Sequence, residues 1–196
     1  KNIQSVIQEA CKEKIETDRK RGILNRPVRA MVVGIPNVGK STLINQISGR
    51  KGAKAENRPG VTRGKQWVTV DSGLLLLDTP GILWPKFEDP EVGVRLAYTG
   101  AVKDDVLDTE ALAARLMQML WKHDPQALRD RYRLEDFPED VPGYALLEAA
   151  GRKRGFLLSR GEIDTERMAR VLLEEYRNGK LGRFTLEVPE DLEVQA

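Results

Sequence analysis

The chain has 196 residues, of which 40% are hydrophobic and 32% charged, enough apolar residues to build the core of a globular protein. No apolar stretch approaches the roughly 20 residues of a membrane-spanning helix, and the first residues lack a signal-peptide pattern. The single cysteine, Cys11, excludes a disulfide within the chain and fits a reducing compartment. We therefore expect a cytoplasmic protein without a membrane span. The net charge of +2 is too small to mark the whole chain as a nucleic-acid binder.

The N-terminal segment is more basic than the rest of the chain. Residues 1 to 30 contain 8 basic and 4 acidic side chains, whereas residues 31 to 120 contain 11 and 10. Apolar residues at helical spacing predict an amphipathic helix over residues 2 to about 20. The basic segment Asp18–Gly22 is expected to end it, because cations are favourable at the negative end of the helix dipole.

A phosphate-binding pattern follows. The string Gly34–Ser41 matches Gly-x-x-x-x-Gly-Lys-Ser, between a predicted buried strand over Arg29–Val33 and a predicted helix over Thr42–Ile47. Lys40 is expected to reach the terminal phosphates and the Ser41 hydroxyl to bind Mg²⁺. The alternative is a glycine turn that enters an ordinary helix. The expected nucleotide-binding residues of this loop are Asn37, Val38, Gly39, Lys40, Ser41 and Thr42.

Downstream of the phosphate loop, Lys54–Gly64 is predicted to be an exposed loop that contains Thr62. A threonine in such a loop can close over the third phosphate and give its hydroxyl to Mg²⁺. A Pro-Gly-x-Thr string alone is a common turn, so the hypothesis rests on the position of Thr62. We expect Thr62 to bind both the nucleotide and the metal.

A second motif ends a predicted hairpin of two strands, Gln66–Val70 and Leu74–Leu77. Asp78, at the end of the second strand, is expected to bind the Mg²⁺ hydration shell, and the Gly81 backbone N–H to approach the third phosphate. Phosphate loop, loop threonine and Asp-x-x-Gly occur in the order of a GTPase. Lys40, Thr62 and Gly81 are the predicted catalytic groups.

These motifs carry a family resemblance. Gly34–Ser41, Arg58–Thr62 and Asp78–Phe87 resemble the circularly permuted GTPases, and within them the ribosome biogenesis GTPase A family. The resemblance continues through Ala97 and through Lys153–Gly155. It implies a GTP-hydrolysing switch in assembly of the large ribosomal subunit, with GTP or GDP and Mg²⁺ as ligands. The subunit precursor, its rRNA and ribosomal proteins are the implied partners.

The resemblance also sets the expected fold class. It implies a partial α/β P-loop GTPase domain in circularly permuted order over residues 1–105 and a small all-α C-terminal domain over residues 106–196. The Asn-Lys-x-Asp element that reads guanine in GTPases is not found in the 196 residues. In the permuted family it lies upstream of the phosphate loop, so we interpret the chain as the C-terminal part of a longer protein. We expect this fragment alone to be inactive in hydrolysis.

Two positions bear on hydrolysis. Ile82 follows the glycine of Asp-x-x-Gly, where many small GTPases have a water-orienting glutamine, and isoleucine cannot hydrogen-bond a water. The single histidine, His123, is interpreted as a surface or capping residue. Asn37 resembles the asparagine of cation-dependent GTPases, which implies a K⁺ site; the alternative is an asparagine chosen for turn geometry.

The last third of the sequence has helical apolar spacing and a basic cluster. Arg152, Lys153, Arg154 and Arg160 are either RNA phosphate contacts or a solvated helix end. Three functions therefore compete: a GTP-hydrolysing ribosome assembly factor, a P-loop ATPase or kinase, and an rRNA-binding module with an inert nucleotide site. The Asp78–Gly81 and Pro59–Thr62 strings argue against the ATPase.

Overall fold

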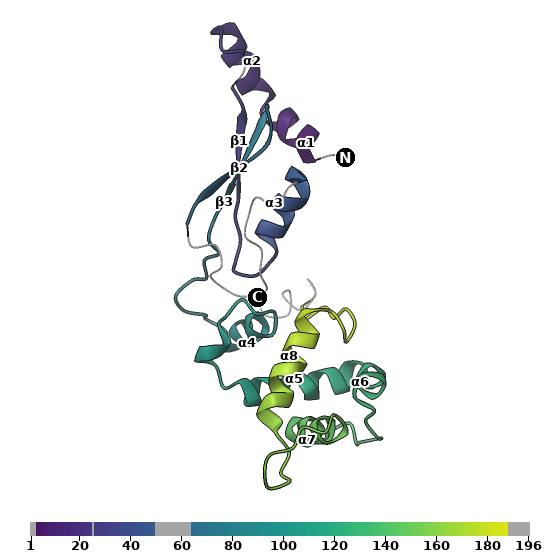
Figure 1. Cartoon of the computed structure of the whole chain (residues 1–196). Coiled ribbons are helices and arrows are strands. Elements are labelled where there is room, and N and C mark those ends of the chain that lie inside the picture. The colour runs from purple at the N-terminus through teal and green to yellow at the C-terminus, as the bar shows by residue number, and fades with distance from the viewer. Residues whose placement is uncertain (1–2, 25, 50–63, 188–196) are drawn as a thin grey trace. The chain divides into compact units, whose positions relative to one another are not determined.

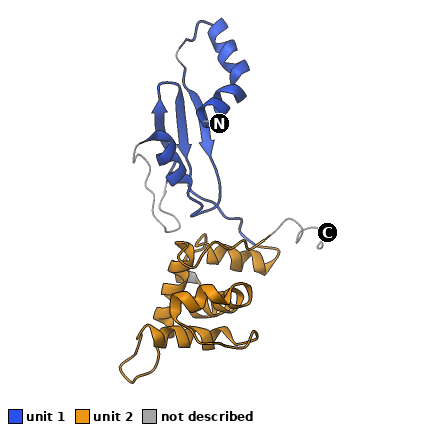
Figure 2. Cartoon of the chain, turned by 90° about the vertical axis from the view of Figure 1, so that its right-hand side faces the viewer, with its two compact units in different colours: residues 1–86 blue, residues 87–196 orange. Residues whose placement is uncertain are grey.

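The structure is a computed structural model that describes residues 3–24, 26–49 and 64–187 (Figure 1). The chain divides into two compact units, residues 1–86 and 87–196 (Figure 2). Within the described residues, no helix has both the length and the apolar content that crossing a bilayer requires.

The N-terminal unit contains a three-stranded sheet. Its strands are β1 (Val28–Val32), β2 (Gln66–Asp71) and β3 (Leu74–Asp78), in the order β1-β3-β2. β1 is parallel to β3, and β2 is antiparallel to β3, as expected for the predicted hairpin. The hairpin turn is closed by the Gly73 backbone N–H, which donates to Asp71 Oδ1 at 2.7 Å. The predicted strands are therefore confirmed within one or two residues.

The described residues of this unit form the helices α1 (Ile3–Ala10), α2 (Lys12–Lys20) and α3 (Lys40–Ser48). The single helix predicted over residues 2 to 20 is interrupted at Cys11, whose backbone angles, φ −104° and ψ 9°, leave the helical region. Helical hydrogen bonds nevertheless continue through the turn, since the Ile15 N–H donates to the Cys11 carbonyl at 3.0 Å.

One face of the sheet carries the small core of this unit. Ile44 of α3 is fully buried against Leu74 and Leu76 of β3, and Ile7 of α1 packs on the same cluster. Because successive side chains of a strand point to opposite faces, Met31 and Trp67 lie on the other face, where they are 60% and 49% exposed.

The C-terminal unit is helical in its described residues. Its elements are α4 (Pro90–Tyr98), the short 3₁₀ helix η1 (Asp104–Val106), α5 (Thr109–His123), α6 (Pro125–Tyr132), α7 (Gly143–Lys153) and α8 (Thr165–Arg177). α5 packs against both α7 and α8. The core between them includes the fully buried side chains of Leu116, Leu146 and Leu172. The division between the units falls before α4, earlier than the predicted boundary at residue 105, because Ala97 and Tyr98 are buried in this helical core.

Aspartates begin four of these helices. Asp89, Asp108, Asp124 and Asp164 each accept a hydrogen bond from a backbone N–H of the first turn. This capping satisfies a donor that has no partner inside the helix. The last helix, α8, begins in this way, with a bond of 2.9 Å from the Arg167 N–H to Asp164 Oδ1.

Candidate functional site

The phosphate loop connects β1 to α3. Gly39 immediately precedes the helix with φ of 87°, a left-handed conformation that glycine adopts without a steric penalty. Asn37 also has a positive φ, 60°, and asparagine tolerates this region better than most residues. The turn-geometry interpretation of Asn37 is thus supported by its backbone. The loop delivers the first turn of α3, whose N–H groups favour an anion.

The parallel pairing of β1 with β3 brings the two predicted motifs together. Val32, at the end of β1, is in register with Asp78, at the end of β3. Ser41 Oγ donates to Asp78 Oδ2 at 2.7 Å, and both residues are buried. The two predicted Mg²⁺ ligands of the described residues are therefore in direct contact, although 37 positions separate them.

The carboxylate of Asp78 has an unused acceptor. Its Oδ1 is buried and accepts no hydrogen bond from the part of the chain that the structure describes. A buried carboxylate oxygen without a donor is costly, so a water or a cation beside it is expected to be stabilising. Among the described residues, no group of three or more histidine, cysteine or acidic side chains is arranged so that it could hold a metal ion. Ser41 and Asp78 fit Mg²⁺, which keeps several waters and takes further oxygens from phosphates.

Lys40 lies on the same loop. Its Nζ donates to the Ile35 carbonyl at 2.8 Å, so the ammonium curls over the loop. Burial lowers the pKa of Lys40, and the nearby Asp78 carboxylate opposes that shift. A polyphosphate would favour the charged amine as Asp78 does, because opposite charges stabilise each other in a partly buried site.

The Asp-x-x-Gly segment packs directly on the phosphate loop. Thr79 Oγ1 donates to the Val32 carbonyl at 2.7 Å. A Cβ placed on Gly81 would lie 2.4 Å from the nitrogen of Pro36, far inside contact distance. Only glycine allows this approach. The role of Thr79 was missed by sequence reasoning, although it lies inside the Asp-x-x-Gly string.

The remaining residues considered for nucleotide binding or for hydrolysis lie around the phosphate loop, on α5 or outside the described residues. Val38 and Thr42 are exposed beside the loop. Thr62 lies outside the described residues. Ile82 is 77% exposed, and His123 is exposed at the C-terminal end of α5. Neither side chain contributes a hydrogen bond to the site described above.

The predicted RNA-contacting cluster is largely engaged in ion pairs. Arg152 pairs with Glu148 at 2.7 Å and Lys153 with Glu135 at 2.9 Å, both on the surface. Arg160 is exposed and forms no ion pair with a described residue. Exposed pairs contribute little stability, so these side chains can exchange their partners for phosphates.

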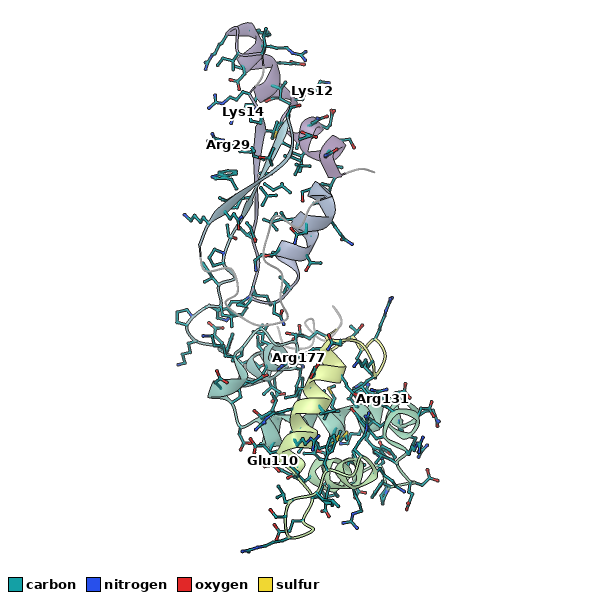
Figure 3. All side chains as sticks on the ribbon, viewed as in Figure 1. Lys12, Lys14, Arg29, Glu110, Arg131 and Arg177 are labelled. Atoms are coloured by element: carbon teal, nitrogen blue, oxygen red, sulfur yellow. The ribbon has the colours of Figure 1, made fainter. Side chains whose placement is uncertain are left out.

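Arg154 differs from its neighbours. It lies 3.3 Å from Glu175, a carboxylate only 7% exposed, and over the Tyr132 ring at 5.4 Å. Arg131, which is labelled in Figure 3, also pairs with Glu175, with Nε 2.9 Å from Oε2. The Tyr132 hydroxyl donates to the same oxygen at 2.9 Å. The hydrogen bond from Arg131 holds the pKa of Glu175 below its usual range, while burial raises the pKa of Tyr132.

This network was not predicted, but the sequence contained a signal for it. Glu175 is three residues after the buried Leu172 and seven after the buried Met168, so it falls on the apolar face of α8. A buried acid needs cationic partners. Arg154 therefore has a structural role in the C-terminal unit.

Comparison with known proteins gives a consistent result. Residues 29–129 match the family described as 50S ribosome-binding GTPase. The chain is 46% identical over 195 residues to ribosome biogenesis GTPase A of Bacillus cereus, and 30% identical over 168 residues to that of Thermotoga maritima. It covers 65% and 59% of these curated relatives, respectively, so it spans less than two thirds of their length.

Two solved structures are similar. A GDP-bound structure of TM YlqF has a TM-score of 0.56 and 28% identity, covering 90% of this chain and 67% of that one. The GNP-bound YlqF from T. maritima has a TM-score of 0.52 and 27% identity, covering 89% and 65%.

Proposed function

This chain belongs to the 50S ribosome-binding GTPase family, and we propose that it acts as a nucleotide-dependent switch in assembly of the large ribosomal subunit. The observation that carries the proposal is the contact between the phosphate loop and the Asp-x-x-Gly segment. Ser41 and Asp78 meet at 2.7 Å, and Gly81 lies against Pro36. The terminal phosphate of a nucleotide bound on the loop would contact both motifs. Both segments would therefore lose a contact when hydrolysis removes that phosphate.

Each residue has a defined part in this proposal. Lys40 neutralises the terminal phosphates after giving up the Ile35 carbonyl, and the first N–H groups of α3 bind the phosphate oxygens. Ser41 and Asp78 hold Mg²⁺, which offsets phosphate charge. The Gly81 N–H reads the third phosphate. Thr62 as a second sensor and Asn37 as a K⁺ ligand extend this assignment, by resemblance to the family.

Base selectivity is a separate question. No Asn-Lys-x-Asp string occurs in the 196 residues, so the group that reads guanine is not supplied by the described motifs. We propose the circularly permuted order for this domain, in which that element precedes the phosphate loop. A chain without it should bind GDP and ADP with similar, weak affinity, since an unread base contributes no discrimination.

The proposed partner is ribosomal RNA, contacted by Arg152, Lys153, Arg154 and Arg160 of the C-terminal unit. Arg160 is the most available of the four, because Arg154 is tied to the buried Glu175 and the other two form exposed ion pairs with described residues. A role in subunit assembly implies a cytoplasmic location.

Nucleotide titration tests the proposal. Lys40→Ala and Ser41→Ala are expected to weaken GTP binding in the presence of Mg²⁺ by about 10- to 100-fold, the effect of losing a charge-assisted contact of about 1.5–3 kcal/mol. Lys12→Ala and Ser72→Ala are matched controls at exposed positions. Wild-type GTP affinity in either loop variant would refute the assignment of the site.

The inert RNA-binding module is the second candidate, favoured by the missing Asn-Lys-x-Asp string. Preferential ADP binding would support a P-loop ATPase, whereas the switch and the inert module both predict similar, weak binding of GDP and ADP by this chain. The switch also predicts that Lys40→Ala weakens this binding. RNA binding together with a nucleotide affinity that Lys40→Ala leaves unchanged would support the inert module.

A further inference from the structure

A cavity of about 200 Å³ lies where α2 meets the start of β1, in the N-terminal unit. Four basic side chains line it: Lys14 and Arg19 from α2, Arg26 from the connecting segment, and Arg29 from β1. Figure 3 labels Lys14 and Arg29 at this junction. The lining includes one acidic residue, Asp18, so the charge of this α2–β1 cavity is strongly positive.

Most of this positive charge is available to a ligand. Asp18 Oδ2 lies 3.8 Å from Arg26 Nη1 and offsets that one cation. Lys14, Arg19 and Arg29 are exposed and form no ion pair within residues 3–24, 26–49 and 64–187. Three uncompensated cations around one concavity repel each other, and a bound anion relieves that repulsion. The charge therefore points to a ligand with several negative groups.

The cavity is separate from the nucleotide site. Arg29 lies at the beginning of β1, whereas the phosphate loop follows its end at Val32. A strand rises about 3.3 Å per residue, so the two ends of β1 are more than about 10 Å apart. None of the described residues assigned to nucleotide or Mg²⁺ lines the cavity.

An aromatic side chain adjoins the basic residues. The Arg29 guanidinium lies 5.5 Å from the centre of the Trp67 ring, and Trp67 is 49% exposed. Cations that track a backbone, next to an exposed aromatic ring that can take an unstacked base, are the combination that binds single-stranded nucleic acid. Inorganic phosphate or an acidic peptide has no base to stack on the indole ring.

We propose that the α2–β1 cavity binds the phosphate backbone of a single-stranded RNA segment. Lys14, Arg19 and Arg29 contact the phosphates, and Trp67 receives an unstacked base. The site adds a second RNA contact, on the GTPase unit, to the one assigned to the C-terminal unit. The ribosomal origin of that RNA rests on the proposed function, whereas the site itself rests on the charge and shape of the cavity.

The salt dependence of RNA binding tests the proposal. The full chain is titrated into a short fluorescent single-stranded RNA, and anisotropy is measured between about 50 and 200 mM salt. Each phosphate contact to a single strand contributes about 0.7 to the slope of log affinity against log salt. The triple variant Lys14→Gln, Arg19→Gln, Arg29→Gln should therefore lower the slope by about 2. When salt rises fourfold over this range, the wild type should lose about 20 times more of its affinity than the variant does.

The matched control removes three exposed cations of the same segment that do not line the cavity: Lys12→Gln, Lys20→Gln, Arg21→Gln. It should retain more of the wild-type slope than the cavity variant. A charge-conserving variant, Lys14→Arg with Arg19→Lys and Arg29→Lys, should keep the full slope, because it retains the three positive charges. Trp67→Ala should weaken binding about tenfold and leave the slope unchanged.

Three results would overturn the proposal. The first is equal loss of slope in the cavity variant and its control. The second is a cavity variant whose salt slope equals that of the wild type. The third is cavity-dependent binding of inorganic phosphate, AMP or anionic lipid vesicles without cavity-dependent binding of RNA. Arg152 and Arg160 are intact in all these variants, so the C-terminal contact contributes equally to each RNA affinity. GTP binding is measured in a separate titration.

Discussion

Replacement of Gly81 by alanine is the sharpest test of the contact between the two nucleotide motifs. The new Cβ would lie 2.4 Å from the Pro36 nitrogen, 2.5 Å from the Pro36 Cα and 2.8 Å from the Ile35 carbonyl carbon. All three are backbone atoms, so no flexible side chain can move aside. Since ordinary Cβ contacts begin near 3.4 Å, the Asp-x-x-Gly segment must retreat from the phosphate loop by about 1 Å.

A retreat of about 1 Å has different effects on the two nucleotides. The Gly81 N–H is assigned to the third phosphate, and a hydrogen bond of about 2.9 Å that lengthens by 1 Å is lost. Loss of one bond to a charged group, about 1.5–3 kcal/mol, should weaken a non-hydrolysable GTP analogue by about 10- to 100-fold. GDP, which lacks that phosphate, should bind within about threefold of its wild-type affinity.

The assay is a titration of both nucleotides, with circular dichroism to verify folding. Gly73→Ala is the matched control, because its Cβ would meet no atom closer than Asp71 Oδ1, at an ordinary 3.4 Å. Gly73 is in the hairpin turn, at the opposite end of β3 from Asp78. An equal effect on GDP and the GTP analogue, or no effect on either, would refute the role given to Gly81.

Three further predictions concern the C-terminal unit. Glu175→Gln should lower the free energy of unfolding by about 3 kcal/mol, measured by urea denaturation, because two arginines lose their buried partner. Since the pKa of Glu175 is lowered in the folded state, its stabilisation is complete above the unfolded pKa of about 4.3. The difference in the free energy of unfolding between wild type and Glu175→Gln should therefore shrink as pH falls below that value. A difference that does not change with pH would contradict this prediction. Arg177→Lys should lower the free energy of unfolding by about 2 kcal/mol, because lysine cannot replace the hydrogen bonds from Arg177, labelled in Figure 3, to the Ala97 and Tyr98 carbonyls and to Asp104. An unchanged urea midpoint would contradict this prediction. Asp108→Ala should lower stability by about 1 kcal/mol through loss of the cap on α5, with Asp108→Asn as the variant expected to retain most of it.

The phosphate loop was predictable because its function depends on local backbone geometry. Strand, glycine-rich turn and helix must follow one another directly, and each leaves a pattern in the sequence. Asp78 was predictable for a related reason: polar residues that end parallel strands meet at the same edge of a sheet. The contact between Ser41 and Asp78 is therefore the result that sequence reasoning anticipated best.

Contacts between segments were harder to predict. Nothing in the string Asp78–Gly81 indicates that Gly81 touches the backbone of Pro36, because that depends on how two loops meet. The start of the C-terminal unit was expected after residue 105, yet Ala97 and Tyr98 of α4 are buried in the helical core. A nine-residue helix carries too little periodicity to reveal which core it joins.

Charge illustrates the same limit and has a functional consequence. Sequence counting treats every lysine and arginine alike. It marked the cluster Arg152, Lys153, Arg154 and Arg160 as either RNA contacts or a solvated helix end. In the fold, Lys153 pairs with Glu135 and Arg154 with Glu175, whereas Lys14 and Arg19 form no ion pair with a described residue, although Asp18 lines the same cavity. Phosphate binding releases counterions from free cations, but a cation tied to a buried carboxylate must first leave that partner. We therefore propose that RNA binding by this chain depends on which of the described cations lack an ion-pair partner, including those of the α2–β1 cavity.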